Sequence, residues 1–208
     1  MSIIYLMDIE TLLTFTIASL TLTLSPGPDI LYVISKSIVQ GKKAAILTSF
    51  GLTSGLVVHT FLIAFGLSIL ISESEYILNS IKIVGVFYFI YLIIKVIQNR
   101  KTDDIPKKDL HNINYFKRGL IMNLLNPKVG LFFTAFFPGF LFHSDLSHQV
   151  QFLILGLIFW LQASIVFLLV SVFASKLNSF SKSNSFYNKY LFVIELLVYV
   201  FIIYWIVR

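Results

Sequence analysis

The segment Ser25-Pro26-Gly27-Pro28-Asp29 places two prolines, a glycine and a carboxylate inside a stretch of apolar residues. Each proline lacks an N–H group and stops the carbonyl four residues earlier from forming its helical hydrogen bond. We therefore expect two half-helices here, with Ser25 as the N-cap of the second and Asp29 in its first turn. The free N–H groups at that helix start can receive a substrate carboxylate, and Asp29 can receive an ammonium group. The alternative is a kink that serves only packing.

A second proline-containing segment carries Asn123, Asn126, Pro127 and Lys128. Pro127 should free the carbonyl of Asn123, so we expect another break in an apolar span. The amide side chains can hydrogen-bond a solute, and the Lys128 ammonium can attract a carboxylate. Two alternatives stay open, since the asparagines can instead join neighbouring helices and Lys128 can extend its ammonium group to the membrane surface.

Small residues recur at helical spacing near these segments. Gly51, Gly55 and His59 follow one another at intervals of four, and Gly119 and Gly130 lie on the same face as the asparagines. Glycines on one face let helices approach closely, so we predict helix packing at these four positions. His59 can relay a proton or simply hydrogen-bond a neighbour.

Three charged residues, Asp29, Lys128 and Glu195, are expected at similar depth in the apolar spans. A lone charge near the bilayer centre costs about 2.5 to 3.5 kcal/mol even on the lenient insertion scale. We therefore expect these side chains to pair or to face a hydrated cavity. Asp29, His59 and Glu195 are the candidates for proton coupling.

The composition shows which solvent the spans face. Hydrophobic residues make up 57% of the 208 residues and charged residues 12%, which is too apolar for a soluble surface. The absence of cysteine excludes disulfides and thiolate metal sites. The net charge of +6 is divided among short connections and forms no single patch, so we expect membrane lipid and no nucleic acid as a partner.

Apolar segments of membrane-spanning length predict an all-α polytopic membrane protein, a single transmembrane domain over residues 1–208. The six expected helices are at about 9–34, 44–71, 76–98, 119–142, 150–175 and 190–207, with a polar loop at about 99–118. Thirteen of the sixteen basic residues lie in alternate connections, including Lys36 in the first. The positive-inside rule assigns these connections to the cytoplasm and both termini to the opposite side. The first and fourth spans then run in opposite directions, as in a 3+3 inverted repeat with two broken helices.

The order of these motifs resembles that of the LysE/RhtB family of amino-acid exporters. The resemblance rests on the segment 25–29, Gln40-Gly41, the series Gly51, Gly55 and His59, Phe116-Lys117-Arg118-Gly119, Asn123, Asn126-Pro127-Lys128, Phe132-Phe133 and Pro138. It implies a bacterial inner-membrane exporter driven by the proton gradient, with an amino acid and protons as partners and no bound cofactor. Glu195 and Gln162 depart from the family pattern, and the sequence leaves the substrate's identity and a homo-oligomer open.

Other functions fit the residues less well. A membrane enzyme would need a nucleophile with its base, a metal cluster or paired thiols, and the chain offers four scattered histidines and no cysteine. A metal-ion exporter needs several carboxylates or imidazoles at one place, and only Asp29, His59 and Glu195 are available within the spans. A scaffold without transport activity would leave two broken, charged spans unexplained. Amino-acid export is therefore the expected function, with metal or other ion export as the alternative.

Overall fold

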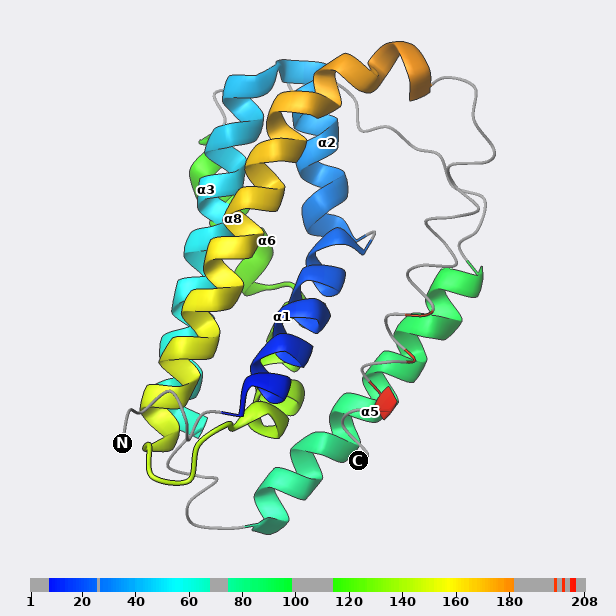
Figure 1. The fold of residues 1–208 in the computed structure, drawn as a ribbon. Helices are drawn as coiled ribbons and strands as arrows, with labels where there is room; N and C mark the ends of the chain where they lie inside the picture. The colour runs from blue at the N-terminus through cyan, green and yellow to red at the C-terminus, as the bar shows by residue number, and fades with distance from the viewer. Residues whose placement is uncertain are drawn as a thin grey trace.

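The computed structural model describes residues 8–25, 27–67, 75–98 and 114–181, together with residues 197, 200, 203 and 204. These residues form helices joined by short connections, and Figure 1 shows most of the helices side by side in one bundle. The chain is thus an all-α polytopic membrane protein, as the sequence predicted. Within the described part, the helices Lys42–Gly66 and His148–Ala174 are each long and apolar enough to cross a membrane, and two bent helix pairs can each form one further span.

The first bent pair consists of α1 (Ile9–Leu24) and α2 (Pro28–Gln40), whose axes differ by 50°. The predicted break therefore lies where the prolines are, although Pro26 itself is outside the described residues. The predicted cap was wrong, because Ser25 is the C-cap of α1 and Gly27 occupies the N-cap of α2. Pro28 takes the first position of α2, where a missing N–H group breaks no helical hydrogen bond.

The prediction that Lys36 lies in a connection was also wrong. α2 continues to Gln40 because no helix-breaking residue follows Pro28 until Gly41, whose φ of 89° only glycine adopts readily. Lys36 lies inside this helix and is buried, with its Nζ atom 4.9 Å from the centre of the Tyr32 ring. A cation over an aromatic face is attracted by the ring's quadrupole, which offsets part of the cost of removing the ammonium from water.

The second bent pair begins with α6 (Tyr115–Leu124) and continues through α7 (Pro127–Leu131), η3 (Phe132–Phe136) and η4 (Phe137–Phe140). The two parts meet at an angle of 47° beside Pro127. α6 begins four residues before the expected start at 119, because the Asn114 side chain caps it by accepting a hydrogen bond of 3.0 Å from the N–H group of Lys117. The polar loop predicted to end at 118 therefore ends before this helix.

The remaining helices are continuous over most of their length. α3 (Lys42–Leu62) passes into a π-helical segment, η2 (Ile63–Leu67), and α5 (Glu75–Gln98) agrees closely with the expected span at 76–98. α8 (His148–Ser181) extends beyond the expected 150–175 at both ends. The expected sixth span at 190–207 lies outside the described residues except at four positions.

Contacts at both ends show that the two bent pairs are antiparallel. At the start of α1, the N–H group of Asp8 donates to the carbonyl of Phe142, just beyond η4, over 3.1 Å. At the other end, the Tyr115 hydroxyl in α6 donates to the Gln40 side chain at the end of α2. The breaks in the middle of the two spans are consequently at the same level of the bundle. The full inverted repeat stays a prediction, because its sixth span is not described.

Side chains on the outside of α8 indicate that the bundle faces lipid. Leu157, Leu161, Ile165 and Leu169 follow one another at intervals of four and are each about half exposed. Such an exposed apolar stripe would be unfavourable in water and is expected in hydrocarbon.

Glycines allow the closest helix contact, between α3 and α6. A side chain at Gly51 would overlap the backbone of Phe116 and Leu120, and one at Gly119 would overlap the backbone of Thr48. Backbone therefore packs directly on backbone at this contact, as small residues permit in membrane bundles.

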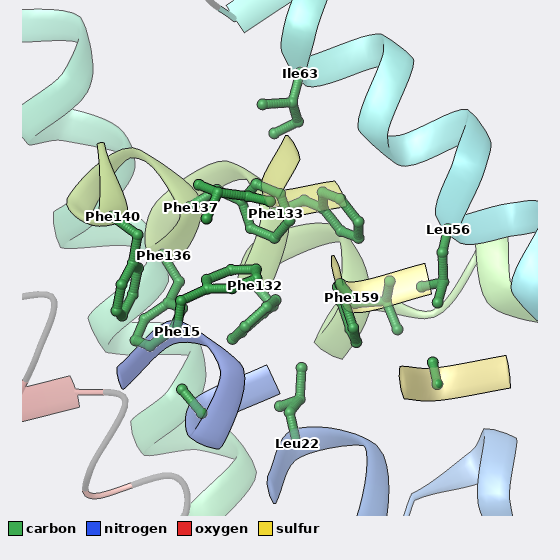
Figure 2. Close-up of a cluster of buried hydrophobic side chains, with 14 of the residues drawn as sticks. Phe15, Leu22, Leu56, Ile63, Phe132, Phe133, Phe136, Phe137, Phe140 and Phe159 are labelled. Atoms are coloured by element: carbon green, nitrogen blue, oxygen red, sulfur yellow. The ribbon is translucent and has the colours of Figure 1, made fainter. Parts of the chain in front are cut away.

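Phenylalanine side chains fill the core beyond the breaks (Figure 2). Phe15 of α1 contacts Phe137 edge to face, with ring centres 5.0 Å apart, and Phe132, Phe133 and Phe136 pack around them. Edge-to-face and offset ring contacts stabilise a core beyond the burial of area alone. The core thus holds the ends of the two broken spans together.

Candidate functional site

The two helix breaks meet at Lys128. The side chain of this residue extends from the first turn of α7 to the other span, where its Nζ atom donates a 3.3 Å hydrogen bond to the carbonyl of Ser25. Ser25 is the last residue of the first half-span, so its carbonyl has no helical partner along the chain. A methyl group added at Gly27 would lie only 3.2 Å from Nζ, which explains why glycine suits this position. Lys128 and Ser25 are both almost completely buried.

A second contact joins the spans, and here the charged group belongs to the first span and its partner to the second. Asp29, in the first turn of α2, accepts a 2.8 Å hydrogen bond from Nδ2 of Asn123, near the end of α6. Asn123 occupies the space that a side chain at Gly55 of α3 would fill. Asn126 instead caps its own helix, because its Oδ1 accepts from the N–H group of Lys128 over 3.0 Å. Each broken span therefore supplies one charged group that forms a hydrogen bond with the other span.

These residues surround a small inner cavity of about 30 Å³. Its polar side is formed by Ser25, Gly27, Asp29, Asn123, Asn126 and Lys128. Its apolar side is formed by Leu22, Ile30, Leu56, Val129, Phe159, Ala163 and Phe167, the last three from α8. The volume is about that of one water molecule in the liquid, so in this closed arrangement the cavity is too small for a solute of several heavy atoms.

Three buried oxygen atoms beside the inner cavity lack a hydrogen-bond partner among the described residues. They are Ser25 Oγ, Asp29 Oδ1 and Asn123 Oδ1. Buried polar atoms are satisfied in the great majority of proteins, so unsatisfied ones gathered at one cavity call for an explanation. A hydroxyl, a carboxylate and an amide oxygen accept hydrogen bonds, and an ammonium group supplies three donors. With the Lys128 cation beside them, the cavity offers complementary charges for both ends of an amino acid.

His59 lies on the far side of Asn123, away from the inner cavity. Its Nε2 atom is 3.4 Å from the carbonyl of Asn123, the carbonyl that Pro127 was expected to free. The N–H group of Asn126 also donates to this carbonyl, over 3.0 Å. The imidazole ring stacks on Phe133, with ring centres 5.3 Å apart.

The predicted site residues thus fall into groups. The structure brings Gly27, Asp29, Asn123, Asn126 and Lys128 to one cavity, while Pro28 and Pro127 begin the half-helices behind them. Gly51 and Gly119 lie in the α3–α6 contact, Gly55 lies against Asn123, and Gly130 lies 3.9 Å from the His59 ring. Pro26 and Glu195 are outside the described residues.

Sequence reasoning missed the residues of α8 that complete the inner cavity. Phe159, Ala163 and Phe167 follow one another at intervals of four, but neighbouring lipid-facing positions of α8 show the same spacing and the same polarity. Only Gln162 marked this helix as unusual, and its Nε2 donates to the Ser19 hydroxyl of α1. The amide therefore anchors α8 beside the first broken span.

The described residues contain no group of three histidine, aspartate or glutamate side chains that could hold a metal ion. The polar side chains at the inner cavity are one carboxylate, two amides, two hydroxyls and an ammonium group. A cation site with an ammonium group in its wall is electrostatically unfavourable. The site thus suits a solute that carries both charges better than it suits a metal ion.

Comparisons with known proteins agree with this chemistry. The family model of LysE type translocators matches residues 20–205. Over 146 residues, 69% of each chain, the sequence is 30% identical to proteins described as leucine efflux proteins in Salmonella typhimurium (strain LT2) and Salmonella typhi. It is 29% identical to an uncharacterized membrane protein of Vibrio cholerae over 153 residues, 73% of this chain and 74% of the relative. No solved structure matches the chain.

Proposed function

The chain belongs to the LysE type translocators, and from this premise we propose that it exports neutral amino acids with aliphatic side chains by proton-coupled secondary transport. Amino-acid export is supported by the family and by the relatives described as leucine efflux proteins. The chemistry of the inner cavity supports the choice of substrate class, and the titratable groups around it support the coupling.

The observation that carries this proposal is the division of the inner cavity into a charged side and a hydrocarbon side. In the open protein, Lys128 binds the solute carboxylate, while Asp29 and the Ser25 and Asn123 oxygens bind the ammonium group. The side chain of the solute then faces Phe159, Ala163 and Phe167. A charged side chain would lose its hydration there without gaining a partner, which favours leucine-like solutes.

Proton coupling uses the groups that join the two breaks. Asp29 holds its position through Asn123, whose carbonyl is in turn 3.4 Å from His59. A proton on Asp29 removes the charge that holds the solute ammonium, so protonation and solute binding exclude each other at this carboxylate. Exchange of a proton for an amino acid follows from that competition. Glu195 remains a further candidate from the sequence.

The protein is proposed to lie in the bacterial inner membrane with both termini outside the cytoplasm. This orientation rests on the basic residues, which include Lys42 and Lys43 at the start of α3. The end of α3 that carries His59 then faces outward.

Efflux from loaded cells tests the proposal. Cells that lack their own exporters are fed leucine- or lysine-containing dipeptides, and the free amino acids that appear outside are measured with and without the protein. We expect faster release of leucine than of lysine. Equal release of both with and without the protein would contradict export of this substrate class.

Two substitutions test the site. Asp29→Asn and Lys128→Met each remove one charge from the inner cavity, and we expect both to abolish leucine release at unchanged protein level in the membrane. Asp145→Asn and Lys117→Met, which remove the same charges at exposed positions, serve as matched controls and should retain release. Normal release from either site variant would contradict the assigned role.

A further inference from the structure

A second and larger cavity lies one helical turn beyond the inner one. This outer cavity has a volume of about 290 Å³ and is lined by residues that include His59, Ile63, Pro127, Gly130, Phe133 and Thr134. Along α3, the inner cavity touches Leu56 and the outer cavity begins at His59, three residues further on. Along α7 the lining residues alternate, with Lys128 and Val129 at the inner cavity and Pro127 and Gly130 at the outer one. The two cavities therefore share α3 and α7 as walls and lie on different sides of α7.

Stacked aromatic side chains lie between the two cavities. Asn123 and Phe159 belong to the inner cavity, whereas His59 and Phe133 belong to the outer one. The two aromatic rings Phe133 and Phe159 stack with their centres 5.5 Å apart. His59 also stacks on Phe133, and its Nε2 atom lies 3.4 Å from the Asn123 carbonyl. These three rings therefore lie where the two cavities adjoin.

The outer cavity has the size and chemistry of a small-molecule site. Its 290 Å³ is close to the lower end of the range for ligand pockets, about 300 Å³, and far exceeds the inner cavity. Aliphatic and aromatic side chains form most of the wall, and the Thr134 hydroxyl is already bonded to the carbonyl of Gly130 over 3.0 Å. The His59 ring is thus the polar group best placed to meet a solute.

Both walls of the outer cavity contain π-helical turns. Ile63 belongs to η2, and Phe133 and Thr134 belong to η3. π-Helical turns occur mostly as short insertions and are frequent at functional sites. Their presence on both sides of one cavity suggests that the helices around it adjust as a solute passes.

We propose that the outer cavity is a second binding site for the exported amino acid, which holds the solute after it leaves the inner cavity. His59, Phe133 and Phe159 form the gate between the two sites. The aliphatic side chain of the solute packs on Ile63, Leu131 and Phe133, and its polar end faces His59. This inference rests on the proposed function and on the proposed orientation.

The absence of cysteine from the chain permits a direct test. Thr134→Cys introduces a thiol of similar size into the outer cavity, and the wild-type protein is an unreactive blank. Right-side-out vesicles carrying the variant are treated with a membrane-impermeant cationic methanethiosulfonate, with and without L-leucine. Ser144→Cys, in the exposed connection before α8, is the control for an outward position with no cavity.

We expect Thr134→Cys to react from the same side as Ser144→Cys, and leucine to slow only the first reaction. With leucine at ten times its half-saturating concentration, the rate should fall about tenfold, because about a tenth of the sites remain empty. Reaction from the opposite side, or an equal rate with and without leucine, would overturn the second site.

Filling the outer cavity provides a second measurement. Gly130→Met should block leucine release, whereas Gly66→Met, at a position outside both cavities where an added side-chain atom meets nothing within 4 Å, should retain it. Normal release from Gly130→Met would count against passage through this cavity. If Asp29→Asn abolishes release but leucine fails to protect Thr134→Cys, only the outer site is wrong. If the wild-type protein releases no amino acid, the proposed function and the outer site are both wrong.

Discussion

Gly55→Ala should impair transport although Gly55 itself does not line the inner cavity. The added methyl group would overlap Asn123, with its Cγ 2.9 Å and its Cβ 2.8 Å away, so the amide must shift. Asn123 then loses its 2.8 Å hydrogen bond to Asp29. A hydrogen bond to a charged group is worth about 1.5 to 3 kcal/mol, and every 1.4 kcal/mol is tenfold in an equilibrium constant. We therefore expect the half-saturating leucine concentration to rise about 10- to 150-fold.

Leucine uptake into inside-out vesicles, which corresponds to export from the cell, gives the half-saturating concentration directly. Gly66→Ala is the matched control, because a methyl group there would meet nothing within 4 Å. Asn123→Ala should raise the half-saturating concentration at least as much as Gly55→Ala, since it removes the bond to Asp29 together with an oxygen that binds the solute ammonium. In the double variant the effects should fall short of additivity, because the bond between Asn123 and Asp29 can be lost only once.

A wild-type half-saturating concentration in Gly55→Ala would show that the position of Asn123 does not matter for solute binding. Fully additive effects in the double variant would show that Gly55 acts through some other contact. Either outcome would remove the argument that Asn123 positions Asp29. Equal impairment by Gly66→Ala would point instead to a general effect of stiffening α3 and η2.

Three further changes test the surroundings of the site. Ala163→Val adds two methyl groups to the apolar side of the inner cavity and should reduce release of leucine more than release of alanine; an equal reduction would contradict the assigned role of this wall. Gln151→Leu removes hydrogen bonds to Phe142, His143 and Leu146, and we expect a loss of about 3 kcal/mol or more of stability. The melting temperature in detergent should therefore fall, whereas Gln149→Leu, at an exposed position, should leave it unchanged. Gly51→Ala forces a methyl group against the backbone of α6 and should cost about 1 to 3 kcal/mol in the same assay, unlike the Gly66→Ala control.

The sequence was sufficient to locate the breaks because proline acts on the backbone locally. Pro28 and Pro127 each begin a half-helix wherever the rest of the chain lies, so the bends beside them follow from residue type alone. Charge counting in the connections also predicted the opposite directions of the two spans, and this places Asp29 and Lys128 at the same level of the bundle. The breaks depend on short stretches of chain, and the directions of the spans depend on the distribution of many basic residues.

The errors concern contacts that only the folded bundle creates. Lys36 was expected in a polar connection because a lysine inside an apolar span is costly, but the Tyr32 ring beside it lowers that cost. Ser25 was expected to cap α2, yet the N-cap lies two residues later, at Gly27, and the Ser25 hydroxyl is left at the inner cavity. Ala163 gave no signal, since a small apolar residue in an apolar helix is compatible with lipid, with packing and with a cavity wall.

The cross-contacts between the breaks explain how the solute can open the protein. In this closed arrangement, the Ser25 carbonyl satisfies Lys128 and the Asn123 amide satisfies Asp29, so each span stabilises the broken end of the other. A half-helix end at membrane depth is tolerated only while its polar groups have partners. An amino acid offers its carboxylate to Lys128, which is a stronger partner than the neutral Ser25 carbonyl. Its ammonium group meets Asp29 Oδ1, which has no partner among the described residues of the closed protein, so the Asn123 bond to Asp29 Oδ2 is kept. The solute therefore binds the separated spans better than the closed ones, and that difference in affinity is what shifts the equilibrium toward the open form.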